Sequence, residues 1–164
     1  MKLIYNTDAA PQLGLSNSIN QTIYEACSKH HKTLFFCWNI RTGIDRGVEL
    51  SRIVEYVKWY GEMILLPKLE IEEQLLFTIL NEDHYLVKRA LKEHRRIRRL
   101  FKIGTNPMKN LIYIEEELDL HIRFEEKNIL PEIENVATHK QLKAINEAFD
   151  RLPNNADYDD LFWE

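Results

Sequence analysis

Turn-forming residues are scarce in this chain, and they gather at a few places. The 164 residues include only five Gly and five Pro, roughly half of average usage. That is too few for the many short loops of a β-sandwich or barrel. The breaks that contain Gly, Pro or Asn lie at 11–14, 43–47, 81–83, 104–107 and 153–155. We therefore expect an all-α protein.

The long stretches between these breaks repeat apolar residues at helical spacing. They predict helices over 16–45, 51–80, 84–101, 107–133 and, shorter, 139–149. Ser16 or Ser18 would cap the first helix, and Pro107 suits the first position of the fourth. Pro67 lies inside the second helix and is expected to kink it.

Four long helices with short connections favour an antiparallel up-down four-helix bundle. We expect residues 1–15 to form an N-terminal segment, 16–135 the bundle, and 136–164 a short helix with a C-terminal tail. The tail ends in Leu161, Phe162 and Trp163, and its stretch 158–163 mixes acidic and aromatic residues. This pattern favours a chain end that packs back on the bundle, with self-association as the alternative.

Charge and cysteine usage favour a cytoplasmic protein. The formal net charge of -4 excludes a protein that is basic overall. Cys27 and Cys37 are ten residues apart on one expected helix, about 15 Å along its axis, so they cannot bridge each other. The chain start lacks the apolar region of a signal peptide, and no apolar run reaches the ~18 residues of a membrane span.

Polar residues interrupt the apolar rows of the expected helices. On the third helix, His94 lies between Ala90 and Ile97. On the fourth, His121 and Glu125 replace two core positions one turn apart, so both side chains share the inner face. A polar residue at such a position in an apolar row predicts a buried polar side chain.

The first two helices repeat this pattern. The second carries Lys68 and Glu72 four residues apart on its apolar row. On the first, either His30 or His31 occupies the inner row ahead of Leu34. Any one of these histidines alone could be a hydrogen-bonded core residue.

Buried carboxylates change this reading, because an unpaired buried Glu costs several kcal/mol and normally persists only when paired or bound to a metal. Glutamate and imidazole together suit a first-row transition metal. We expect iron, with zinc or manganese as alternatives.

Four motifs then follow in a recognisable order. They are HKTLFFCW at 31–38, EEQLLF at 72–77, EHRRI at 93–97, and the block from His121 to Pro131. Over roughly residues 19–134 the chain resembles the hemerythrin-like (HHE cation-binding) family. The resemblance implies a four-helix bundle around a non-haem di-iron centre that binds or senses dioxygen, or holds iron.

The resemblance also implies a ligand set. His31 matches the ligand of the first helix, His94 that of the third, and His121 with Glu125 the pair of the fourth. Glu72 matches the carboxylate of the second helix, which in the family bridges the two irons together with the counterpart of Glu125.

One position departs from the family pattern. Where the family has Pro-His-Phe, this chain has Pro67-Lys68-Leu69. Ile64, one turn earlier, supplies no replacement ligand. The loss removes the imidazole partner that the family pairs with the ligand at His31.

We therefore expect an altered centre, in which the Lys68 ammonium lies between Glu72 and Glu125 and supplies the charge of the missing iron. One metal then remains, on the imidazoles of His94 and His121 and on both carboxylates. Two alternatives stay open. Lys68 could place its amine in water beside a weakened two-metal site, or the site could be metal-free.

These features predict a metal-binding or sensing protein and not an enzyme. Its partners would be one iron ion, with two as the alternative, and dioxygen or another small diatomic ligand. A one-metal centre should lose the reversible dioxygen binding that needs two irons. The alternative is a metal-free structural or interaction bundle whose site is satisfied by Lys68.

A basic stretch lies on the third expected helix. Lys88, Lys92, Arg95, Arg99 and Lys102 share one face, which is typical of a surface for nucleic acid or an acidic partner. The other reading is a solvated face paired with acids such as those at 115–117. We favour the second, and do not expect nucleic acid as a partner, because the chain is acidic overall and no exposed aromatic residues interleave with the bases.

Overall fold

The computed structural model describes residues 20–154 and 157–164, and within these ranges the chain is all-helical. The predicted segment 1–15 and the predicted caps Ser16 and Ser18 lie outside the described residues. The α-helices are α1 (Asn20–Asp45), α2 (Leu50–Tyr60), α3 (Leu66–Ile71), α4 (Tyr85–Leu100), α5 (Pro107–Phe124), α6 (Leu130–Val136) and α7 (His139–Asp150).

Wider π-helical turns interrupt the second and fourth expected helices, which were predicted as continuous. These turns are η1 (Gly61–Leu65), η2 (Glu72–Leu76) and η4 (Glu125–Ile129), and a short 3₁₀ turn, η3 (Phe77–Ile79), follows η2. Turn η1 ends just before Pro67, and turn η4 just before Pro131. Because proline has no backbone N–H to donate, the wider turn carries the chain past a missing bond of the α-helical ladder.

Local sequence accounts for the helix starts. Pro107 begins α5 as predicted, and the Asn106 side chain caps it by accepting from the Lys109 N–H. The His84 ring caps α4 by accepting from the Leu86 N–H. Thr138 and Gln141 form a capping box at the start of α7.

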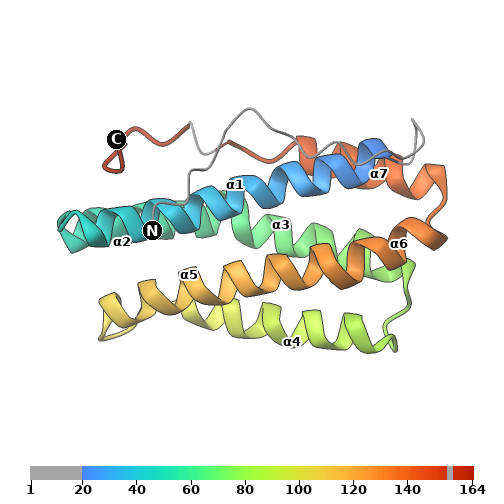
Figure 1. The fold of residues 1–164 in the computed structure, drawn as a ribbon, viewed down its shortest axis with the longest axis horizontal. Coiled ribbons are helices and arrows are strands. Elements are labelled where there is room, and N and C mark those ends of the chain that lie inside the picture. Colours follow the sequence, from blue (N-terminus) through green and yellow to red (C-terminus); the bar gives the residue numbers. More distant parts are fainter. Residues whose placement is uncertain (1–19, 155–156) are drawn as a thin grey trace.

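The long helices lie side by side (Figure 1). Helix α1 packs along α5, and α4 packs along α5 and η4. Helix α7 contacts α1 and α3 near one end of the molecule. Among the described residues, no helix combines the length and the apolar character that crossing a membrane requires.

The C-terminal residues pack on the helices. Phe162 and Trp163 are buried, and the Arg46 guanidinium donates to the backbone carbonyls of Trp163 and Glu164. Phe162 fits against Gly43, where a Cβ would meet its ring at 2.7 Å.

The apolar core divides into two clusters along the helices. On α4, Ala90 belongs to one cluster and Ile97 to the other, with His94 between them. On α5, Leu118 and Phe124 are divided in the same way around His121. His94 and His121 therefore lie in a polar layer between two apolar clusters.

Candidate metal centre

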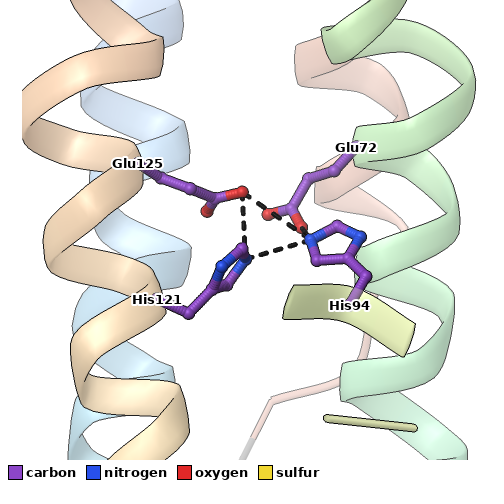
Figure 2. A group of neighbouring side chains, drawn as sticks. All are labelled: Glu72, His94, His121 and Glu125. Atoms are coloured by element: carbon purple, nitrogen blue, oxygen red, sulfur yellow. Dashed lines mark hydrogen bonds and ion pairs between the residues drawn. The ribbon is translucent and has the colours of Figure 1, made fainter. Parts of the chain in front are cut away.

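Four buried side chains meet in this polar layer (Figure 2). Glu72 begins η2, His94 lies on α4, His121 on α5, and Glu125 begins η4. None is more than 2% exposed, and one ligand atom from each lies within 4.8 Å of the others. These residues are four of the five that the sequence predicts for the metal site, and the group could hold a metal ion.

Their separations match those expected of ligands around one ion. His94 Nε2 lies 3.0 Å from His121 Nε2 and 3.5 Å from Glu72 Oε2. Glu125 Oε1 lies 3.2 Å from His121 Nε2 and 3.8 Å from His94 Nε2. Metal–nitrogen and metal–oxygen bonds are about 2.0–2.2 Å, so atoms that share a metal lie at about these distances from one another.

Both histidines are held from behind by carboxylates. His94 Nδ1 lies 2.7 Å from Glu73 Oε1, and His121 Nδ1 lies 2.8 Å from Glu93 Oε2. An ionised carboxylate only accepts, so each Nδ1 carries the hydrogen and donates it. This arrangement directs both Nε2 atoms to the centre, as metal-bound histidines require.

Three carboxylate oxygens in the centre lack an aligned hydrogen-bond donor among the described residues: Glu72 Oε2 and both oxygens of Glu125. Two of them, Glu72 Oε2 and Glu125 Oε1, lie beside the facing Nε2 atoms. Buried polar groups are normally satisfied, so these oxygens fit a bound cation. The residues present thus suit a metal with mixed nitrogen and oxygen ligands.

Lys68 is buried, with its side chain 2% exposed. Its ammonium donates to Glu72 Oε1. The alternative in which the Lys68 amine reaches water is therefore wrong.

The first-helix residue in the layer is His30 and not His31. His31 is exposed, whereas His30 is 1% exposed. On α1 the buried positions include Thr33, Phe36 and Ile40, a helical row that His30 continues and His31 leaves. The prediction of His31 as a ligand is wrong on geometry.

His30 reaches the carboxylate oxygens that face Lys68. Its Nε2 lies 3.0 Å from Glu125 Oε2 and 3.8 Å from Glu72 Oε1, and its Nδ1 lies 3.3 Å from Glu126 Oε1. Each inner carboxylate thus directs one oxygen to the paired histidines and the other to the cationic side chains of His30 and Lys68.

The π-helical turns coincide with the inner carboxylates. The backbone carbonyl of Glu72 accepts from the Phe77 N–H, and that of Glu125 accepts from the Leu130 N–H, each five residues further along the chain. Such single turns often occur at functional sites. In both, the first Glu points inward, while the second Glu contacts a histidine ring: Glu73 contacts His94 and Glu126 contacts His30.

Electrostatics keep the inner groups charged in the metal-free protein. Burial and Glu125 raise the pKa of Glu72, but Lys68 and two histidines lower it below its ordinary value. Burial raises the pKa of Glu125, but His121, His30 and His94 hold it well below. Burial lowers the pKa of Lys68, whereas both carboxylates raise it above its ordinary value.

The histidines also hold protons strongly without a metal. Burial and the Lys68 ammonium lower the pKa of His30, but three surrounding carboxylates outweigh them and raise it to about 10. Burial lowers the pKa of His121, but Glu125 and Glu93 raise it to about 9. A metal at His121 Nε2 must therefore displace a proton.

Sequence reasoning did not identify the outer carboxylates Glu73, Glu93 and Glu126. Glu73 and Glu126 could have been found from the sequence, because each is the second residue of a Glu-Glu pair whose first member lies on the inner row. Glu93 carried no such signal, since it precedes His94 in the chain but contacts His121 on another helix.

The outer carboxylates predict a measurable effect. Glu93→Ala is expected to weaken metal affinity about 10- to 100-fold, because His121 loses the acceptor that orients its ring. Isothermal titration with Zn²⁺ or Fe²⁺ measures this. Glu116→Ala, which removes an exposed acid from α5, the helix that carries His121, is the control. Equal affinities for the two variants would contradict the orienting role.

A second prediction concerns pH and the metal-free protein. The pKa values of His30 and His121 rise from about 6.5 in the unfolded chain to about 10 and about 9 in the folded one. The contribution of these two histidines to the stability of the folded protein is complete below pH ~6.5 and is lost as the pH rises through 9 to 10. Glu72 and Glu125, whose pKa values are lowered, stabilise the folded protein above pH ~4.5, and this contribution is lost in acid.

Urea unfolding of chelator-treated protein at a series of pH values tests this. The urea midpoint should decrease as the pH is raised from 7 to 10. In His121→Asn this decrease should be smaller. An unchanged midpoint across this range in the unsubstituted protein would contradict the assignment.

Comparison of the chain with protein-family models, with curated proteins and with solved structures gave no match.

Proposed function

We propose that this protein binds a single iron ion through His94, His121, Glu72 and Glu125. One observation carries the proposal. The two imidazole Nε2 atoms face each other at 3.0 Å, while both Nδ1 atoms are committed to glutamates. Two lone pairs at this distance repel unless a proton or a metal lies between them, and two carboxylate oxygens lie beside the same point.

We further propose that the helices form an up-down bundle of the hemerythrin type. The ligand order along the chain supports this: a Glu from the second long helical segment, a His from α4, and a His with a Glu four residues on from the segment that begins with α5. In Figure 1 the colours run along the sequence, and they show that successive long segments run in alternating directions, which agrees with this arrangement.

Lys68 takes the role of a second cation in this proposal. Its ammonium contacts Glu72 Oε1, the carboxylate oxygen opposite the one near His94. Together with His30 it neutralises the side of the carboxylates that the paired histidines leave free. A protonated lysine cannot ligate a metal, so the centre holds one metal and not two.

An iron ion here would supply redox chemistry and a position for dioxygen or another small diatomic ligand. The chain's contribution is to fix the four ligands, orient both imidazoles through Glu73 and Glu93, and exclude water from a layer of buried residues. We propose a binding or sensing role for this centre.

A second candidate is a metal-free structural or interaction bundle. The observation that favours it is the charge balance of the layer, in which Lys68 and the protonated His30 and His121 compensate both buried carboxylates.

Metal titration separates the two candidates. Chelator-treated protein is titrated anaerobically with Fe²⁺, and separately with Zn²⁺ and Mn²⁺, by calorimetry and thermal melting. We expect a ratio of one per chain and a higher melting temperature, since a ligand at 100 times its Kd adds about 2.7 kcal/mol. His94→Ala should abolish both effects, and His139→Ala, at an exposed histidine on α7, should retain them. No binding by the unsubstituted protein would favour the metal-free bundle.

A further inference from the structure

Helix α4 and the turn that follows it carry a row of basic residues on their outer face. Five of them surround a hollow of about 410 Å³: Lys92, Arg95, Arg98, Arg99 and Lys102. All except Arg98 are exposed. We call these four exposed residues, Lys92, Arg95, Arg99 and Lys102, the α4 basic row.

The α4 basic row differs from the neighbouring basic residues in its lack of ion pairs among the described residues. Within the part of the chain that the structure describes, none of its four side chains forms an ion pair, although neighbouring bases do. Arg96 pairs with Glu117 at 2.6 Å, and Glu115 forms its ion pair with Arg41 on α1. The acids at 115–117 were expected to neutralise the basic face, and that expectation is wrong for this row.

An unpaired row is costly to keep. Like charges three and four residues apart on a helix repel, by about 0.2–0.5 kcal/mol per pair. The chain has more acids than bases, so acids were available to pair with this face. The contacts among the described residues do not account for the arrangement, whereas an outside partner of opposite charge would.

We propose that the α4 basic row binds an acidic segment of a partner protein, in which Asp or Glu side chains flank an apolar one. The row begins at Lys92 on α4 and ends at Lys102, two residues past the end of the helix at Leu100. It therefore spans about 15 Å, so several carboxylates can engage it at once. Arginines bind carboxylates through two parallel hydrogen bonds. The aliphatic stems of long basic side chains offer apolar surface, which suits an apolar side chain seated in the hollow.

The lining of the hollow argues against single-stranded nucleic acid. Such ligands are bound by positive grooves that also present aromatic side chains for base stacking. The residues around this hollow are all Lys or Arg. The surface therefore offers charge and aliphatic stems without a stacking platform.

Arg98 differs from the row. It donates to Glu73 at 2.7 Å, and Glu73 contacts His94. Substituting Arg98 would disturb the candidate metal centre as well as the surface. It is therefore left unchanged in the test, which keeps the outcome independent of whether the protein binds metal.

The test uses the full chain and a fluorescein-labelled peptide of Glu-Glu-Leu repeats, with anisotropy as the readout at low salt. The row variant combines Lys92→Gln, Arg95→Gln, Arg99→Gln and Lys102→Gln. The matched control combines Lys58→Gln, Lys127→Gln, Lys140→Gln and Lys143→Gln, which removes equal charge from exposed positions elsewhere.

We expect the row variant to bind the peptide about tenfold more weakly or worse, because four modest ion pairs are lost together, and the control to bind within about twofold of the unsubstituted protein. Added salt should weaken binding, and a Gln-Gln-Leu peptide should not bind. Equal weakening in both variants, or no binding by the unsubstituted protein, would overturn the proposal. Tighter binding of an oligothymidylate of equal charge would also overturn it, in favour of nucleic acid.

Discussion

Replacing Lys68 by methionine is expected to lower the free energy of unfolding of the metal-free protein by about 3–5 kcal/mol. Lys68 and Glu72 are both buried and paired. Methionine keeps much of the apolar stem but removes the ammonium, so the two inner carboxylates lose a compensating charge. Removing one partner of a buried pair is costly for this reason, even where the intact pair adds little.

The same variant is expected to depend on metal more than the unsubstituted protein does. A divalent ion replaces the lost positive charge, so the increase in stability on adding Fe²⁺ or Zn²⁺ should be larger in Lys68→Met. Urea unfolding with and without metal measures both effects. Lys58→Met, at an exposed lysine of α2, is the matched control. Equal unfolding midpoints for the two variants without metal would refute the role given to Lys68.

Replacing Lys68 by histidine is expected to raise the bound metal from one ion to two per chain. The introduced imidazole can ligate, whereas an ammonium cannot. It would join His30 and the second oxygens of Glu72 and Glu125, which lie within 3.8 Å of His30 Nε2. Four ligands of the same kinds as those around His94 and His121 would then hold the second ion.

Metal content after saturation and desalting, measured by plasma mass spectrometry, checks this prediction. Adding His30→Ala to Lys68→His should return the ratio to one, because the second ion loses an imidazole. Adding His31→Ala instead should leave it at two, since His31 is exposed. A ratio of one in Lys68→His would show that the lysine is not what limits the centre.

The inner faces of the helices could be predicted from the sequence, because apolar periodicity reports burial directly. On the fourth long segment, His121 and Glu125 are buried as predicted, and so are the apolar residues of the row that they interrupt, namely Leu111, Ile114, Leu118 and Ile129. The polar residues in such rows were therefore reliable signs of buried polar side chains. The burial of Lys68 and Glu72 follows the same rule.

The choice between His30 and His31 needed the helical phase, and the residues alone left both open. A helix advances 100° per residue, so adjacent histidines point in different directions, and Leu34 lies one turn from either. The motif match selected His31. The packing of Phe36 and Ile40 sets the phase of α1 and places His30 inside.

The outer carboxylates depend on contacts between helices, which periodicity does not report. Glu93 reaches His121 across the interface of α4 and α5, and Glu73 reaches His94 from the segment that carries Glu72. The π-helical turns at Glu72 and Glu125 could not be predicted either, because the periodicity argument assumes a constant 3.6 residues per turn. The antiparallel hemerythrin-type arrangement and the identity of the metal stay predictions.

The most direct test of the proposed centre is a crystal grown with Fe²⁺ under anaerobic conditions, with diffraction data collected at the iron absorption edge. We predict one anomalous peak per chain, bonded to His94 Nε2, His121 Nε2, Glu72 and Glu125, with the Lys68 ammonium still in contact with Glu72. Two peaks bridged by the carboxylates, or no peak at saturating iron, would contradict a one-metal centre completed by Lys68.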